Sequence, residues 1–188
     1  MSRYIRFTSL LLILTTLSSW AQESSDCNVY YTGMDPQLKE TRIDIAQEHF
    51  FAHTNKKLKP SFKDRDMVVG KANITQIGKM SYLRIEIEIA TRNAFASYGY
   101  IPKVNVLTVQ FLNGDKAYLY AVSDTKGVYD SEKDKTIYNT FYIIDKEKPF
   151  IKADIDKIGV FWSTGYEEYI VYDVDLLKRQ FACLKQQS

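Results

Sequence analysis

The sequence contains few of the residues from which common catalytic centres are built. Its 188 residues include 2 histidines, 2 cysteines and 8 glycines. Because the glycines are scattered singly, as in the segments Tyr98–Tyr100 and Thr164–Tyr166, no glycine-rich loop is present that would cradle phosphates. A Gly-x-Ser-x-Gly nucleophile motif is also absent. These absences count against nucleotide-dependent enzymes and serine hydrolases of that type, and we expect no cofactor.

The sequence also lacks a marked excess of charge of either sign. It has 25 Lys and Arg residues against 23 Asp and Glu residues, a formal net charge of +2. Arg3 and Arg6 belong to an N-terminal segment that we expect to be removed, which leaves 23 basic residues against 23 acidic ones. Proteins that bind nucleic acid usually carry a basic surface. We therefore expect no nucleic-acid partner.

Only one long apolar run is present, and it lies at the N-terminus. Arg3 and Arg6 precede the uncharged stretch Phe7–Ala21, which ends in Ser-Trp-Ala. A basic start, a short apolar core and small residues at Ser19 and Ala21 are typical of a secretory signal peptide, and the core is too short to span a bilayer. We predict cleavage near Ala21, and no second run predicts a membrane span.

The remaining part of the chain, residues 22–188, has a length that suits one domain with its own core. Neither internal repeats nor low-complexity linkers divide it. The prediction is therefore a signal peptide over residues 1–21, followed by a single exported domain over 22–188, located in the periplasm or secreted.

Cys27 has three possible roles: a lipid attachment site, half of a disulfide, or a reactive thiol. Lipidation requires a cysteine directly after the apolar core, whereas Ser24, Ser25 and Asp26 intervene here. The other cysteine is Cys183, and an even number of cysteines in an exported chain favours a disulfide. We predict that Cys27 pairs with Cys183, which would stabilise the fold by about 4–5 kcal/mol in the chain-entropy model.

Alternation of apolar and polar residues organises the rest of the sequence. The clearest case is the segment Tyr82–Ala90, which predicts a strand with one wet face. Two hairpins are predicted, one around Asn113-Gly114-Asp115 and one around Thr164-Gly165-Tyr166. Further strands are predicted over Leu38–Ile45, Asp66–Ile77, with a bulge or bend at Gly70, and Thr136–Ile144.

Helical spacing is rarer and is strongest near the C-terminus. Apolar residues recur at three and four positions within Val174–Lys185, with Gln180 and Cys183 on the same face. Shorter helices are predicted within Arg92–Tyr98 and around Pro149. The predicted fold is mainly β, α+β at the margin: an antiparallel sheet or sandwich of about seven strands with hairpins and a C-terminal helix.

Several segments of the chain resemble small secreted proteins of Bacteroidetes. The segments are CNVYY, KETRIDI, NAFASYG, FLNGDKAYLY and VFWSTGYEEYIVYDVDLLKRQFACL, which begin at residues 27, 39, 93, 111 and 160. The resemblance covers most of residues 22–188. It implies an exported, mostly β protein of a Gram-negative bacterium with a cysteine near each end. It implies no activity and no catalytic residue.

The two histidines, His49 and His53, are the candidate metal ligands. On a helix they would share a face and could hold an ion together with Asp44 or Glu48. On a strand they would lie ~13 Å apart, too far for one ion. The alternation just before them favours a strand, so surface or packing roles are the preferred interpretation.

Paired carboxylates are the other candidate catalytic groups, because glycoside hydrolysis needs two of them facing one sugar. Glu86 and Glu88 share the polar side of one predicted strand, while Glu167 and Glu168 lie in the second hairpin. We interpret both pairs as solvated surface residues, and we predict no catalytic residue.

Aromatic residues are plentiful in the predicted hairpins. Trp162, Tyr166 and Tyr169 lie in the second hairpin, and Tyr118 and Tyr120 lie at alternate positions in the first. Ordinary packing between strands explains some of them. Others must face outward, where a row of rings can stack on sugars or anchor a protein partner. These five residues are the candidate binding surface.

The leading hypothesis is a secreted or periplasmic, non-enzymatic binding or assembly domain at the bacterial envelope. Its partner would be an envelope protein or a polysaccharide. The alternative is a metal-assisted or carboxylate-based hydrolase that acts on a cell-surface polymer.

Overall fold

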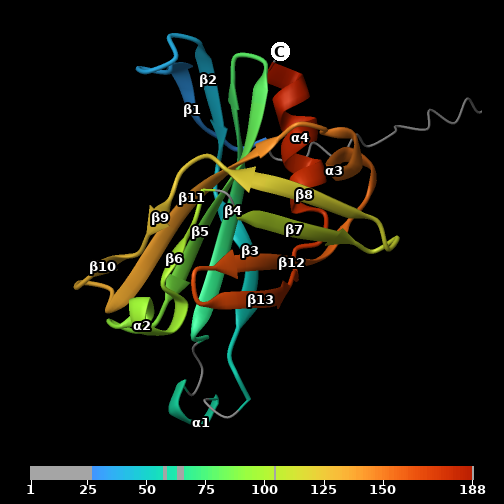
Figure 1. The fold of residues 1–188 in the computed structure, drawn as a ribbon. Helices are drawn as coiled ribbons and strands as arrows, with labels where there is room; N and C mark the ends of the chain where they lie inside the picture. The colour runs from blue at the N-terminus through green and yellow to red at the C-terminus, as the bar shows by residue number, and fades with distance from the viewer. Residues whose placement is uncertain (1–26, 57–58, 63–65, 104, 188) are drawn as a thin grey trace, which may run out of the picture.

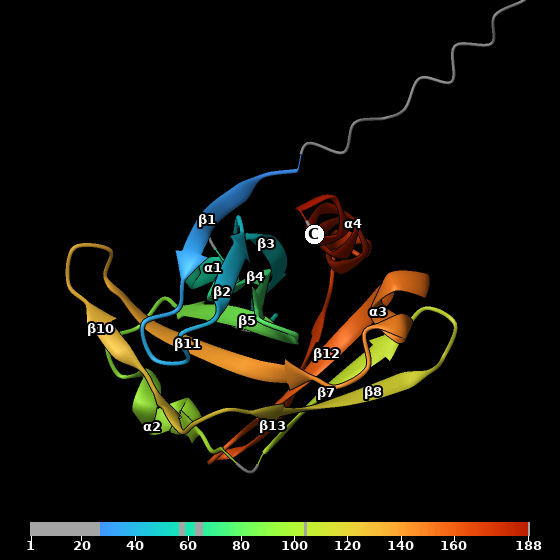
Figure 2. The same ribbon diagram turned by 90° about the horizontal axis from the view of Figure 1, so that it is seen from above.

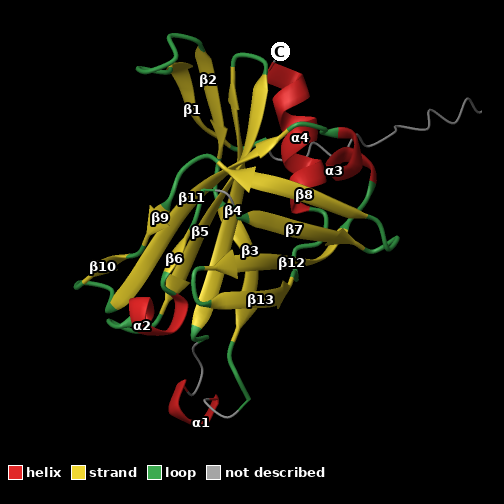
Figure 3. Ribbon diagram, viewed as in Figure 1, coloured by secondary structure: helices red, strands yellow, loops and turns green. Residues whose placement is uncertain are grey.

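A computed structural model describes residues 27–56, 59–62, 66–103 and 105–187 (Figure 1). The fold is mainly β, as the sequence predicted, with antiparallel hairpins and a C-terminal helix (Figure 3). It contains more strands than the seven or so that the sequence predicts.

The strands are β1 Val29–Met34, β2 Thr41–Ile45, β3 Glu48–His53, β4 Val68–Ile77, β5 Met80–Ile89, β6 Tyr100–Ile101, β7 Val106–Phe111, β8 Lys116–Ala121, β9 Thr125–Lys126, β10 Val128–Asp130, β11 Lys135–Ile144, β12 Ile155–Trp162 and β13 Gly165–Ile170. The helices are α1 Lys59–Phe62, α2 Ala94–Tyr98, α3 Lys148–Lys152 and α4 Leu176–Gln187. Among the described helices, none is both long and apolar enough to cross a bilayer.

One sheet of eleven strands forms most of the molecule. Its order is β1-β2-β4-β5-β11-β8-β7-β12-β13, while β3 pairs with β4 and β10 pairs with β11. Strands β6 and β9 form a separate two-stranded sheet. Every pairing is antiparallel, and β4 and β5 pair without a break from Val68↔Ile89 to Ile77↔Met80.

The sheet curls around a common interior (Figure 2), and the chain just after its last strand, β13, reaches β3, which pairs with β4. Val171, just beyond β13, forms an isolated bridge with Phe51 of β3. The backbone N–H of Tyr172 also donates to the carbonyl oxygen of Phe50 over 3.2 Å. Because the interior is enclosed in this way, inward-facing side chains on β3 and β13 pack against each other.

The apolar half of the predicted alternation is confirmed on β5 and in the first hairpin, whereas Glu88, on the predicted wet face of β5, is buried as well. Leu83, Ile85, Ile87 and Ile89 of β5 are all buried. Strands β7 and β8 pair across a turn at Gly114, whose φ of 87° lies in the region that glycine adopts most readily. The interior is thus built from one face of each strand, as the pattern indicated.

Gly70 does not form the bulge or bend that we predicted in β4. The irregularity lies instead in the neighbouring strand β3, between His49 and Phe51, and Phe51 pairs with Gly70. A side chain at Gly70 would collide with the ring of Phe51. The glycine therefore makes room for a core aromatic ring, which stacks on Tyr169 with ring centroids 4.6 Å apart.

Helix α4 has the buried face that its spacing predicted. Leu176, Leu177, Gln180, Cys183 and Leu184 are buried, as expected, and Phe181 joins them. The helix packs against α3, β4 and β2. It therefore covers the region where the first strands of the sheet separate.

Candidate functional site

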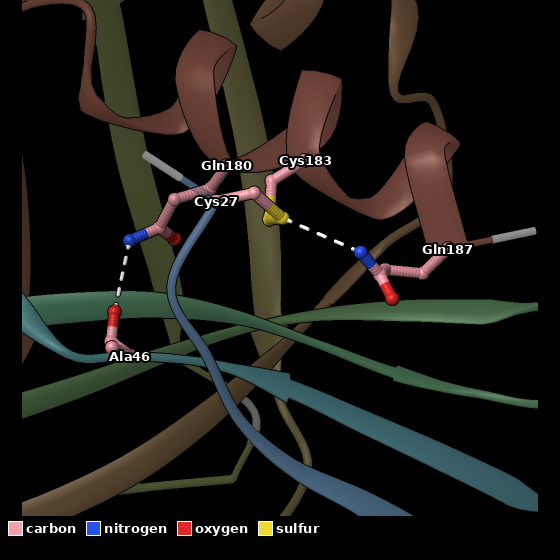
Figure 4. The surroundings of a disulfide bond; sticks show 5 residues. All are labelled: Cys27, Ala46, Gln180, Cys183 and Gln187. Atoms are coloured by element: carbon pink, nitrogen blue, oxygen red, sulfur yellow. Dashed lines mark hydrogen bonds between the residues drawn. A yellow bond between two sulfur atoms is a disulfide. The ribbon is translucent and has the colours of Figure 1, made fainter. Parts of the chain in front are cut away.

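Cys27 and Cys183 form a disulfide, as the sequence predicted, between the segment before β1 and helix α4 (Figure 4). The two Cα atoms lie 5.1 Å apart, although the residues are separated by 156 positions. The side-chain N–H of Gln187 also approaches the Cys27 sulfur at 3.6 Å. Both cysteines are used by this bond, so their role is structural.

Gln180 joins the same helix to the sheet. Its Oε1 accepts the backbone N–H of Ile74 at 2.7 Å, and its Nε2 donates to the carbonyl oxygen of Ala46 at 3.3 Å. A hollow of about 210 Å³ beside the disulfide is lined by Gln180, Arg179 and Glu48. Since Arg179 pairs with Glu48 and Asp173, this hollow is bordered by charges that already have partners.

The candidate metal ligands lie on a strand and not on a helix. His49 and His53 are exposed residues of β3, and they pair with Lys71 and Val68 of β4. Four residues along a strand span ~13 Å, so the shared helical face that a metal site requires is not formed. Within the described residues, no three His, Cys, Asp or Glu side chains gather closely enough to hold an ion.

The Glu86–Glu88 pair is held by lysines. Glu88 is buried, and its carboxylate accepts hydrogen bonds from Lys135, at 2.6 Å, and from Lys71, which also approaches Glu86 at 3.4 Å. Burial would raise the pKa of Glu88, but the hydrogen bonds from Lys135 and Lys71 outweigh it and lower the pKa to about 2. A carboxyl group with this pKa is not a general acid at neutral pH.

Glu167 and Glu168 point to opposite sides of β13. Glu167 accepts the hydroxyl of Tyr169 at 2.7 Å, whereas Glu168 pairs with Lys157 of β12 at 2.7 Å. The hydrogen bonds from Lys157 and Tyr166 lower the pKa of Glu168. The two carboxylates therefore do not face one substrate, as a glycosidase pair would.

The proposed aromatic surface is partly wrong, because two of its five members are buried. Trp162 and Tyr169 are only 3% and 0% exposed. The ring of Trp162 packs edge-to-face against Tyr98 and Tyr138, with centroids 5.1 and 5.0 Å apart. Both residues lie on the inward face of the curled sheet, where aromatic rings fill the interior.

The other three members, Tyr118, Tyr120 and Tyr166, are exposed, at 57%, 53% and 43%. On β8 the tyrosines point outward because Leu119 and Ala121 take the inward positions. The sequence did not indicate which face of β8 is buried, and the structure shows that it is the face with Leu119 and Ala121. Tyr166 and Tyr169 are three positions apart on β13, so their side chains point to opposite faces of the strand. Because Tyr169 lies inside, Tyr166 faces outward.

Strand pairing brings a fourth ring, Phe161, to this surface. Phe161 is 39% exposed and pairs directly with Tyr166 across the second hairpin, with ring centroids 4.5 Å apart. Phe161 is not among the five predicted residues, although it alternates with Val160 and Trp162, both of which are buried. We define Tyr118, Tyr120, Phe161 and Tyr166 as the aromatic face.

The register of the strands places polar groups between these rings. Tyr118 of β8 pairs with Thr108 of β7, Thr108 pairs with Gly159 of β12, and Gly159 pairs with Glu168 of β13. Facing residues of neighbouring strands lie ~5 Å apart. The aromatic face is therefore crossed by a row in which a ring, a hydroxyl group, a bare backbone position and a carboxylate follow one another.

Tyr166 is held in place by this row. Its hydroxyl lies 3.1 Å from Thr108 Oγ1 and donates to Glu168 Oε1 at 3.0 Å. A side chain at Gly159 would collide with this hydroxyl and with Thr108, so the ring lies over the glycine. An exposed ring that is fixed in this way loses little conformational freedom when a ligand stacks on it.

Two hollows adjoin Tyr118. A small one of about 50 Å³ lies toward Tyr166, with Gly159 and Thr108 among its lining residues. A larger one of about 310 Å³ is lined by Tyr120, Lys146 and Pro149, among others. It lies where β8 separates from β11, because these strands pair only at Tyr142↔Ala121 and Ile143↔Tyr120. Lys116 and Tyr118 line both hollows.

Comparison of the chain with protein-family models, with curated proteins and with solved structures gives no match. The function of the aromatic face therefore has to be inferred from its own residues.

Proposed function

We propose that the protein is an exported, non-enzymatic binding domain of the bacterial envelope, and that it binds its partner through the aromatic face. The observation that carries this proposal is the position of Tyr166, which is exposed and yet held by Thr108, Glu168 and the space above Gly159. Exposed rings on a rigid scaffold are typical of surfaces that bind sugars or protein partners.

Export is supported by two independent features of the chain. The Cys27–Cys183 disulfide is of a kind that persists mainly in oxidising compartments. The basic and apolar segment at the N-terminus has the pattern of a signal peptide, with cleavage near Ala21, although it lies outside the described residues. The intact mass of the protein recovered from its host is the direct test: we expect residues 22–188 less two hydrogens.

A hydrolase receives less support from the same structure. Of the four carboxylates that are candidates for catalytic groups, Glu88 and Glu168 are paired with lysines, and their pKa values are lowered. Each of them would therefore act as a hydrogen-bond acceptor or a structural ion and not as a proton donor.

The binding proposal is tested with envelopes isolated from a host strain that lacks the gene. The protein, purified from its host, is sedimented with these envelopes, and the bound fraction is measured over a range of concentrations. We expect the double variant Tyr118→Ala/Tyr166→Ala to weaken binding by about tenfold or more, since exposed aromatic anchors dominate such surfaces.

Tyr30→Ala is the matched control, because Tyr30 is 79% exposed on β1, and this strand lies away from β8 and β13 in both views (Figures 1 and 2). We expect this variant to bind as the wild type does. Equal binding by the wild type and the double variant, with both correctly folded, would show that the aromatic face is not the binding surface.

A further inference from the structure

We propose that the ligand of the aromatic face is an acidic polysaccharide, whose chain lies across β8, β7, β12 and β13 with its sugar rings on Tyr118 and Tyr166. This inference rests on the proposed function, because it assigns a ligand class to the same surface. It is carried by three features of the face: its shape, the alternation of rings with polar groups, and Lys116 beside Tyr118, a cation that has no ion pair among the described residues.

The shape favours an extended ligand. The hollows of about 50 and 310 Å³ lie on either side of Tyr118, so the tyrosine forms a ridge between them. The Tyr166 ring borders the smaller hollow at its other end, where it lies over Gly159. A linear polymer can follow this line from α3 to β13. The smaller hollow is below the volume range of pockets that enclose a small molecule, and the larger one is at the lower end of that range.

The alternation of rings and polar groups matches the two faces of a sugar. A pyranose ring has an apolar C–H side, which stacks on an aromatic ring, and a rim of hydroxyl groups, which form hydrogen bonds. Between Tyr118 and Tyr166 the smaller hollow is lined by Thr108, Gln110 and Lys157. These side chains supply hydroxyl, amide and ammonium groups at the level where the sugar rim would lie.

The same polar groups argue against a protein partner. The core of a protein interface is depleted in charged residues, and lysine is particularly uncommon there. Here the register of β8, β7 and β12 places the row Lys116–Gln110–Lys157 beside the row that starts at Tyr118, on the side away from Phe161. Lys116 and Lys157 also line the smaller hollow. A protein that covered this row would have to desolvate two ammonium groups, whereas a hydrated polysaccharide hydrogen-bonds to them.

The charge of the face favours an acidic polymer over a neutral one. Glu168 is already paired with Lys157 and with the Tyr166 hydroxyl. Within the described part of the chain, Lys116 has no ion pair, although it is close enough to Glu168 to help lower the pKa of that carboxyl group. Because Lys116 lines both hollows, its ammonium group is available to a carboxylate on a sugar stacked at Tyr118.

The test uses affinity electrophoresis of the purified protein in gels that contain polygalacturonate or, separately, uncharged hydroxyethylcellulose. We expect retardation by polygalacturonate and much less by hydroxyethylcellulose. Tyr118→Ala and Tyr166→Ala should each weaken binding to polygalacturonate about tenfold, the equivalent of one lost stacking contact. Because these side chains are exposed, the variants should keep the circular dichroism spectrum and urea midpoint of the wild type.

Lys116→Gln separates charge from stacking. It should weaken binding to polygalacturonate severalfold and make the affinity less dependent on salt, because one screened ionic contact is lost. Lys79→Gln, in the turn between β4 and β5, is the matched control and should leave binding unchanged. Equal retardation of the wild type by both polymers, with no effect of Lys116→Gln, would overturn the assignment to acidic polysaccharides.

The failure of this inference and the failure of the proposed function give different results. If neither polymer retards the protein, while Tyr118→Ala/Tyr166→Ala still abolishes envelope binding, the face binds a protein or another envelope component and the polysaccharide inference is wrong. If the tyrosine variants bind both polymers and envelopes like the wild type, the aromatic face is not a binding site and both proposals are wrong.

Discussion

The side-chain amide of Gln180 on α4 accepts the backbone N–H of Ile74 on β4 at 2.7 Å, across 106 positions of the sequence. Ile74 lies where β4 changes its partner. Strand β3 pairs with β4 as far as Ala72, and strand β2 pairs with β4 from Thr75 onward. At this point neither strand offers the Ile74 N–H an acceptor. Gln180 therefore accepts the hydrogen bond for which the neighbouring strands have no acceptor. It connects helix α4 to the point on β4 where the partner changes from β3 to β2.

We predict that Gln180→Leu lowers the free energy of unfolding by about 2–3 kcal/mol, because the Ile74 N–H and the Ala46 carbonyl would lose their partner in a buried place. Urea unfolding at neutral pH measures this change. Gln186→Leu makes the same exchange at an exposed position of α4 and should alter stability by less than ~0.5 kcal/mol. A Gln180→Leu protein as stable as the wild type would contradict the role assigned to this side chain.

The disulfide should contribute more than any single side-chain contact. For a loop of the length between Cys27 and Cys183, the chain-entropy model gives about 5 kcal/mol. Cys27→Ser/Cys183→Ser should therefore unfold at a markedly lower urea concentration than the oxidised protein. Addition of reductant should bring the wild type to the midpoint of the variant and leave the variant unchanged. If the oxidised and reduced wild type share one midpoint, the bond does not stabilise the fold.

Glu88 predicts a pH dependence of stability. Its pKa in the folded protein is about 2, below the value of 4.5 for an unperturbed glutamate. A depressed folded-state pKa stabilises the protein above the unfolded value, and this stabilisation is lost as the pH falls from about 5 toward 2. We expect Glu88→Gln to cost about 2 kcal/mol at pH 7 and progressively less below pH 4.

The measurement is urea unfolding of the wild type and of Glu88→Gln at pH 7, 5 and 3. Glu132→Gln is the control, since Glu132 is exposed and should show no such trend. If the stability difference between the wild type and Glu88→Gln is the same at all three pH values, the ion pairs of Glu88 with Lys71 and Lys135 do not stabilise the fold through the charge of the carboxylate.

Gly159 leaves the space that the Tyr166 hydroxyl occupies, so a substitution there tests whether the position of this ring matters for binding. Gly159→Ala would push the Tyr166 hydroxyl away from Thr108 and Glu168, because the new methyl group would occupy its place. We predict weaker binding to envelopes and a loss of stability below ~1 kcal/mol, since the exposed tip of Tyr166 can move aside. Thr108→Val removes one hydrogen-bond partner without crowding the ring, and it should have the smaller effect on binding. An unchanged affinity for Gly159→Ala would mean that the position of Tyr166 does not matter.

Much of the fold follows from local pattern. The alternation in β5, the Asn-Gly turn between β7 and β8, and the apolar stripe of α4 each identify an element from a few neighbouring residues, and all three are present. The disulfide also followed from the sequence, because only one pair of cysteines exists. These features depend on periodicity and composition, which a single sequence contains.

The aromatic surface could be predicted only in part. Alternation separates Trp162 from Phe161, but it does not say which of the two faces the interior. That choice depends on the curl of the sheet, which turns Trp162 toward Tyr138 from a strand far away in the sequence. Pairing between distant strands likewise creates the change of partner at Ile74, and nothing near Ile74 in the sequence indicates it.

The disulfide between Cys27 and Cys183 also determines the result of proteolytic cleavage between these two residues. A single cut at an exposed turn, for example at Gly114, would leave two pieces that remain covalently joined through the disulfide and packed in one sheet. No fragment would be released, and the cut strands would stay beside their partners. Where proteases are present, a nicked molecule would keep its aromatic face assembled, and only reduction together with cleavage would take it apart.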